Sequence, residues 1–158
     1  MDCSEALRAR RSVRKFKEGV KIPSEHLKLL LEAAMCAPSA VNSRPWEFFI
    51  AESEEAKASL MAAHPASRML ATASLAIVVC GRPGPQANLE FLPQGCAAAT
   101  ENILLQAGGP RLRQLLVRLL PCPAAHGCGA QGARHERRAR IHHSDRRAGR
   151  TARHEGVL

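Results

Sequence analysis

The sequence predicts an α+β fold in which helices pack on a small mixed sheet. Two short apolar runs, at 46–51 and 74–81, are typical of strands, and the second is rich in β-branched residues. Elsewhere, apolar residues recur every three or four positions, which is the spacing of one helix face. The chain has 158 residues, enough for one domain with a buried core.

Two helices are predicted ahead of the strands. Asp2 or Ser4 can cap a first helix that ends near Arg10. A longer helix begins at Ser24, whose hydroxyl can accept a hydrogen bond from the first-turn amides. Pro38 ends this helix, because a proline drives the residue before it out of the helical region. Its apolar stripe consists of Leu27, Leu30, Leu31, Ala34 and Met35.

The remaining elements alternate between strand and helix. A loop at 38–45 leads into the strand at 46–51. Ser53 then begins a helix whose first residues, Glu54 and Glu55, place negative charge at the favourable end of its dipole. The run at 74–81 is predicted to be a central strand covered on both faces. An alanine-rich helix at 95–107, apolar nearly all round, is predicted to be deeply buried.

The composition changes near Ala107 and divides the chain into residues 1–107 and 108–158. The first part holds every Phe, Trp and Lys and is nearly neutral. The second part has no aromatic residue and no Lys, but it has 11 Arg and 5 His. Its 11 Arg against 3 acidic residues give +8 of the formal net charge of +9, with His counted as neutral. The first part is therefore predicted to carry the fold and the function, and the second to be incomplete or irregular.

An Ala/Gly/Arg/His bias without aromatic residues is typical of GC-rich coding DNA translated out of frame. We hypothesise that residues from about Gly108 onward are read in a shifted frame, and the coding sequence around codons 105–112 would test this. Three alternatives stay open: an arginine-rich arm on nucleic-acid phosphates, a zinc site at Cys122, His126 and Cys128, and a disordered charged tail. The absence of aromatic residues for base stacking and the irregular Cys/His spacing argue against the first two.

The sequence argues against a membrane-spanning or secreted protein. No run approaches the roughly 20 apolar residues that cross a bilayer, and the N-terminus lacks the apolar region of a secretory signal. A cytoplasmic location is therefore expected. The six cysteines include no C-x-x-C pair, so free thiols are expected, with Cys80 and Cys96 buried. No metal site is assigned to residues 1–107.

Two segments of the first part carry candidate binding residues. One places three guanidinium groups and a hydroxyl at a helix end, which suits phosphate oxygens, although a basic cluster alone is more often a solvated surface. Its residues are Arg10, Arg11, Ser12 and Arg14. The other is a loop of small side chains bracketed by prolines, where a flat ligand can approach the backbone and an amide offers both donor and acceptor. Its residues are Pro38, Ser39, Ala40, Asn42 and Arg44. Alone, this second segment would be only a connection.

Together, the order R-R-S-x-R-x-F, a helix, and A-P-S-x-x-N-x-R-P-W-x-F resembles the FMN-dependent nitroreductase family. The resemblance covers about residues 8–107, and residues 94–102 resemble that family's buried central helix. It implies a nitroreductase-like α+β fold and an intertwined homodimer with FMN at the subunit interface. It also implies hydride transfer from NAD(P)H through the flavin to nitroaromatics, quinones or similar electron-poor acceptors.

The resemblance also implies roles for the two segments. Arg10, Arg11, Ser12 and Arg14 would hold the FMN phosphate and ribityl chain. Pro38, Ser39, Ala40, Asn42 and Arg44 would border the flavin, with the 38–40 side contributed across the dimer. Trp46 and Phe48 are expected in the core. Because the flavin itself carries the hydride chemistry, no catalytic acid or nucleophile is assigned.

The sequence departs from the family pattern after Ala107. There the family continues with a glycine-rich turn, a Gly-x-Tyr-Pro type of segment, another helix, a closing strand and basic residues that reach the phosphate. None of these is visible in residues 108–158, and Gly95 stands where related proteins often carry Asp. The alternative functions are therefore a non-catalytic remnant of such an enzyme and, less favoured, a basic-tailed nucleic-acid-binding protein.

Overall fold

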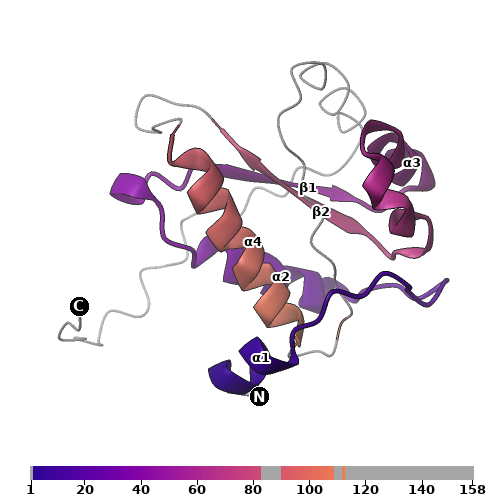
Figure 1. The fold of residues 1–158 in the computed structure, drawn as a ribbon, viewed down its shortest axis with the longest axis horizontal. Coiled ribbons are helices and arrows are strands. Elements are labelled where there is room, and N and C mark those ends of the chain that lie inside the picture. The colour runs from indigo at the N-terminus through magenta and orange to yellow at the C-terminus, as the bar shows by residue number, and fades with distance from the viewer. Residues whose placement is uncertain (1, 83–89, 109–111, 113–158) are drawn as a thin grey trace.

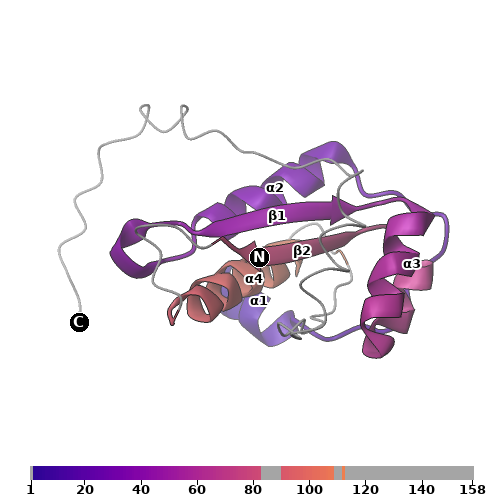
Figure 2. The same cartoon turned by 90° about the horizontal axis from the view of Figure 1, so that it is seen from above.

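A computed structural model describes residues 2–82, 90–108 and 112. The described part contains four α-helices and two strands: α1 (Cys3–Ala9), α2 (Ser24–Met35), β1 (Trp46–Ala51), α3 (Glu54–Ala63), β2 (Ala76–Gly81) and α4 (Leu92–Gly108). Short 3₁₀ segments occupy Ala40–Asn42 and Pro65–Thr72. Figure 1 shows α2 and α4 side by side against the strands, and Figures 1 and 2 both place α3 at one end of the sheet. The α+β prediction is confirmed.

The helix starts follow the predicted chemistry in two of three cases. Asp2 caps α1 in a capping box with Glu5, each side chain bonding the other residue's backbone N–H. The Ser53 hydroxyl accepts from the Ala56 amide and caps α3. The prediction for α2 was wrong, because Ser24 is its first helical residue and makes no capping hydrogen bond. Pro23 occupies the N-cap position and has no side-chain hydrogen-bonding group to cap the helix.

The described sheet consists of β1 and β2, which pair antiparallel from Trp46 opposite Gly81 to Ala51 opposite Ala76. The described residues thus contain no parallel pair of the kind a mixed sheet requires. The prediction of a central strand covered on both faces was also wrong, since every residue of β2 up to Cys80 is only partly buried. In a two-stranded sheet each strand is an edge, and the described helices α2 and α4 cover one face.

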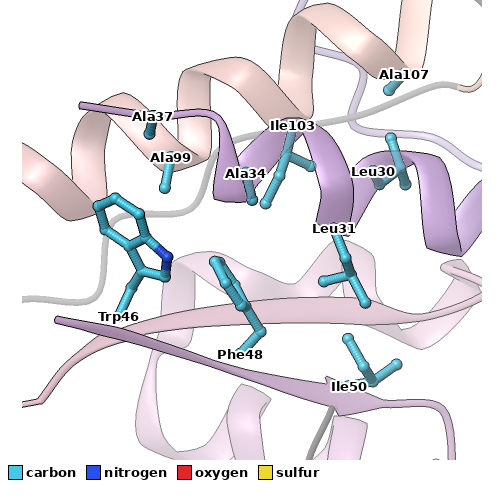
Figure 3. Close-up of a cluster of buried hydrophobic side chains, with 10 residues drawn as sticks. All are labelled: Leu30, Leu31, Ala34, Ala37, Trp46, Phe48, Ile50, Ala99, Ile103 and Ala107. Carbon is cyan, nitrogen blue, oxygen red and sulfur yellow. The ribbon is translucent and has the colours of Figure 1, made fainter. Parts of the chain in front are cut away.

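The core lies between that sheet face and the two long helices. Figure 3 shows Trp46, Phe48 and Ile50 pointing from β1 toward α2 and α4. They alternate along the strand with residues of the other face, as the pleat requires. The helices supply mostly small or branched residues, so the rings sit close to the helix backbones. The helix members of the cluster are Leu30, Leu31, Ala34, Ala99, Ile103 and Ala107.

Helix α4 begins at Leu92, three residues before the predicted start. It is buried on one side only: Ala99 is fully buried while Ala97 and Glu101 are exposed. The prediction that this helix is deeply buried is therefore correct for one face of α4 and wrong for the opposite face, as far as the described residues show. Asn102 donates from Nδ2 to the carbonyl of Ala33 at 3.1 Å and ties α4 to the last turn of α2.

Gly95 lies inside α4, where it faces Trp46. A Cβ at this position would lie 3.5 Å from the indole Cζ3 and 4.0 Å from the Ser39 Cβ, which is ordinary van der Waals contact. Because glycine costs a helix interior roughly 0.5–1 kcal/mol relative to alanine, we expect Gly95→Ala to raise the free energy of unfolding by about that amount. Urea unfolding followed by Trp46 fluorescence would measure it, and a decrease would show that the methyl group does not fit.

Candidate functional site

The arginine segment begins where α1 ends. Arg10 is the C-cap residue of α1, and its backbone N–H donates to the Ala6 carbonyl at 3.0 Å. Helix α1 packs against α4, as both cartoon views show. Arg10 is half-buried at this contact, whereas Arg11, Ser12 and Arg14 are exposed.

The three guanidinium groups have different surroundings. The Arg10 Nε lies 4.0 Å from Oε1 of Glu101 on α4. Arg11 donates from Nη1 to the carbonyls of Arg8 at 2.5 Å and Arg10 at 2.8 Å, so it satisfies carbonyls at the end of its own helix. No described residue bonds the side chain of Arg14. Arg10 and Arg14 are therefore better placed to hold an anion than Arg11 is.

The proline-bracketed loop is closed by hydrogen bonds centred on Ser39. Its carbonyl accepts from the Asn42 amide at 2.9 Å, and its hydroxyl accepts from the Arg44 amide at 2.9 Å. The hydroxyl proton of Ser39 is then available to donate elsewhere. Arg44 also donates from Nε to Oδ1 of Asn42 at 2.9 Å. The Asn42 oxygen is thus engaged within the loop, whereas no described residue bonds its amide nitrogen.

The same loop holds a strained backbone. Val41, Asn42 and Arg44 have φ of 47°, 54° and 47°, in the left-handed region that L-residues avoid. For a β-branched residue such as Val41 this is an outlier, and its side chain is 84% exposed, so no burial compensates for the strain. Such strain, which costs on the order of 1–3 kcal/mol for each residue, clusters at ligand-binding segments.

The two segments contact different faces of α4. Ser39 lies beside Gly95 on the face turned to the sheet, whereas Arg10 pairs with Glu101 on an exposed face. Six residues separate these positions, which corresponds to roughly 9 Å along the helix axis and about 120° around it. Figures 1 and 2 agree that α1 and the 3₁₀ segment Ala40–Asn42 lie apart. Within one chain the structure therefore does not bring the two predicted segments together.

The aromatic residues next to the loop belong to the core, as predicted. Trp46 is 7% exposed and Phe48 is 4% exposed. The indole Nε1 of Trp46 donates to the Met35 Sδ at 3.2 Å, which satisfies its polar atom inside the core. The end of α2 thus helps to fix the strand that follows the loop.

The four cysteines among the described residues form no disulfide bond. Cys80 and Cys96 are partly buried, less than predicted, while Cys3 and Cys36 are exposed. Burial raises the pKa of the Cys80 thiol above the ordinary 9.0, and Cys96 and then Glu47 add to the rise. Burial also raises the pKa of the Cys96 thiol. Both are poor nucleophiles at neutral pH.

These shifts predict a pH effect on stability. A folded-state pKa above the unfolded value means that the neutral thiol is preferred in the fold, so its contribution is complete below pH 9 and is lost as the pH rises through the folded pKa. We expect unfolding free energies to fall at alkaline pH, and to fall less in Cys80→Ala. The exposed Cys3→Ala is the control, and identical alkaline curves for wild type and Cys80→Ala would contradict the assignment.

The described residues contain no group of three His, Cys, Asp or Glu side chains that could hold a metal ion. None of the described helices is long and apolar enough to cross a membrane. The predicted tail, residues 108–158, including the candidate zinc ligands and the arginine-rich arm, lies outside the described residues except for Gly108 and Leu112.

Sequence reasoning missed Glu101 as a neighbour of the arginine segment. It is the single charged residue of α4, and that isolation was the available signal. The strain at Val41 and Arg44 had no signal, because neither residue type favours a positive φ.

Known proteins resemble this chain in sequence and in fold. Residues 7–78 match the model of the Nitroreductase family. Over 107 residues, 68% of this chain, the sequence is 39% identical to the "Putative NADH dehydrogenase/NAD(P)H nitroreductase" of Methanothermobacter thermautotrophicus, of which the match covers 56%. The chain thus spans little more than half the length of this curated relative.

Solved structures give the same result. The crystal structure of a protein of the same description from Parabacteroides distasonis superposes with a TM-score of 0.75 at 32% identity, covering 82% of this chain and 76% of that one. A "putative nitroreductase" from Desulfovibrio desulfuricans, solved in complex with FMN, gives a TM-score of 0.67 at 27% identity, covering 73% of this chain and 67% of that one. The chain belongs to the nitroreductase family.

Proposed function

We propose that this chain is an FMN-dependent, NAD(P)H-consuming oxidoreductase of the cytoplasm that reduces nitroaromatics, quinones or similar electron-poor acceptors. The observation that carries this proposal is the family match at residues 7–78, because that range contains both candidate segments and the helix between them. Relatives named NAD(P)H nitroreductase and the FMN complex from Desulfovibrio desulfuricans support it.

The donor set fits FMN in two halves. Arg10, Ser12 and Arg14 offer two guanidinium groups and a hydroxyl, which suit a phosphate. The loop offers the Ser39 hydroxyl proton, the Asn42 amide nitrogen and small side chains at Pro38 and Ala40, which suit the polar edge and flat face of a flavin. Arg11 and Arg44 support the site indirectly. The hydrogen bond of Arg11 stabilises the end of α1, and that of Arg44 stabilises the loop.

A homodimer with FMN between the subunits would unite these halves. Each segment lies on its own face of α4, so a second copy could present its loop to the first copy's arginines. Val41, at the tip of the loop, is 84% exposed and Phe91, just before α4, is 44% exposed. Large apolar side chains of this kind are stabilised when a second copy covers them.

When bound, the flavin supplies the hydride chemistry. The protein's own residues position and hold it. Guanidinium groups compensate the phosphate charge, and the strained loop keeps its donors in place before the ligand arrives. A preorganised loop of this kind loses less entropy on binding.

The direct test is flavin binding and turnover by the full chain. Purified protein should quench FMN fluorescence on titration and oxidise NADH or NADPH in the presence of nitrofurazone or menadione. Size-exclusion chromatography with light scattering should give a dimer. A colourless protein that leaves FMN fluorescence unchanged would contradict the proposal.

The composition of residues 108–158 favours a second candidate, a non-catalytic remnant that folds without retaining flavin. The family's Gly-x-Tyr-Pro type of segment has no counterpart there, because the chain contains no Tyr, and each charge-assisted phosphate contact that this stretch fails to make would cost about 1.5–3 kcal/mol of binding. Limited proteolysis separates the candidates, since an enzyme should protect the segment past Ala107 when FMN is added. Sequencing the coding DNA at codons 105–112 tests the shifted frame.

A further inference from the structure

We propose that Glu101 of α4 is a positioning residue that orients the Arg10 guanidinium for the phosphate of the bound cofactor. The inference rests on the proposed function, because it assigns a role to Glu101 within the same site. It depends on a contact that joins residues 91 positions apart in the chain: the Arg10 Nε lies 4.0 Å from the Glu101 Oε1.

The contact has a consequence for which Arg10 atoms remain available. A guanidinium group carries five N–H donors, one on Nε and two on each Nη. The carboxylate lies at the Nε edge, and no described residue bonds the two Nη nitrogens. Their fork is the part that binds two oxygens of one phosphate. Glu101 thus attracts the Nε edge of the group without a hydrogen bond and leaves the paired donors without a described partner.

The surroundings allow a modest restraint. The side chain of Arg10 is 34% exposed and that of Glu101 is 49% exposed, so the attraction between them is partly screened by water. Helix α1 packs on α4 at this point, which fixes the backbone of both residues. In contrast, Arg11 is directed to the carbonyls of its own helix. Glu101 is therefore what differentiates Arg10 from its neighbour.

Two variants separate attraction of Arg10 from repulsion of the phosphate. Glu101→Ala removes the carboxylate and should weaken FMN binding about two- to fivefold, the range expected for a partly exposed ion pair. Glu101→Gln keeps the shape of the side chain but removes its charge, and because a separation of 4.0 Å is an ion pair rather than a hydrogen bond, it should weaken FMN binding by a similar factor. If Glu101 acted only as a negative charge beside the phosphate, both variants would bind FMN more tightly, which would overturn the proposal.

Riboflavin lacks the phosphate of FMN, so comparing the affinities for the two flavins separates an effect on the phosphate contact from a general effect on the fold. We expect its affinity to be the same in wild type, Glu101→Ala and Glu101→Gln, measured by flavin fluorescence titration of the full chain. An equal loss of FMN and riboflavin affinity in Glu101→Ala would show general loosening of the fold and would also overturn the proposal.

Arg10→Ala distinguishes failure of this inference from failure of the proposed function. It should weaken FMN binding by about 10- to 100-fold and leave riboflavin unchanged, as expected for a charge-assisted phosphate contact. If Arg10→Ala had this effect while Glu101→Ala had none, the positioning role would be wrong and the cofactor site would stand. If Arg10→Ala had no effect on FMN, the proposed phosphate site itself would be wrong.

Discussion

Replacing Phe48 by alanine is expected to lower the free energy of unfolding by about 3–5 kcal/mol, the usual cost of deleting a large core ring. Phe48 is 4% exposed and belongs to the cluster that joins β1 to α2 and α4. The helix residues facing it are small, including Ala34 and Ala99, so neighbours cannot collapse into the space that the ring leaves. The measurement is urea unfolding followed by Trp46 fluorescence.

Phe49→Ala is the matched control, because Phe49 is the next residue of the same strand and faces the other side of the sheet. It is only partly buried, and its removal should cost clearly less than that of Phe48. A loss as large as that of Phe48→Ala would mean that the second sheet face is as well packed as the first, contrary to the described core.

Replacing Arg14 by alanine is expected to weaken FMN binding by about 10- to 100-fold without changing riboflavin affinity, since a hydrogen bond to a charged group contributes about 1.5–3 kcal/mol. Arg14 is exposed, and no described residue bonds its side chain. Its charge is therefore available to the phosphate. Fluorescence titration with the two flavins provides the measurement.

Arg11→Ala is the control for this experiment. Its guanidinium bonds the carbonyls of Arg8 and Arg10, so its removal should loosen the end of α1 and change FMN affinity much less than Arg14→Ala does. A larger effect at Arg11 than at Arg14 would show that the bound state redirects Arg11 to the phosphate and would contradict the division of roles among the three arginines.

Much of the described fold follows from local sequence rules. The strand at 46–51 has the predicted limits because Pro45 and Glu52 flank a mostly apolar run that only Glu47 interrupts, and Asp2 and Ser53 cap their helices as their side chains allow. Ser24 does not cap α2 because Pro23 occupies the N-cap position and Ser24 is already the first helical residue. The 3₁₀ segment Pro65–Thr72 was not predicted, since tertiary contacts with α3 rather than periodicity define it.

The candidate site was less accessible to sequence reasoning. Residue types identified the cationic segment and the polar loop, but not the face of α4 that each contacts. That placement follows from how α1 and the loop pack on the helix, which involves residues some 50–90 positions apart. The division among the arginines is likewise a matter of geometry, because Arg10, Arg11 and Arg14 are chemically identical in the sequence.

In the proposed dimer, the arginine segment of one copy and the loop of the other hold one FMN. A mixing experiment tests this shared site, with Arg10→Ala/Arg14→Ala as one homodimer and Asn42→Ala as the other, each impaired in FMN binding. After subunit exchange, half of the dimers are mixed, and each mixed dimer holds one site with both segments intact. Tight FMN binding should therefore return at about a quarter of all sites. If subunits exchange and no tight binding returns, the two segments do not act across the dimer and the shared site is wrong.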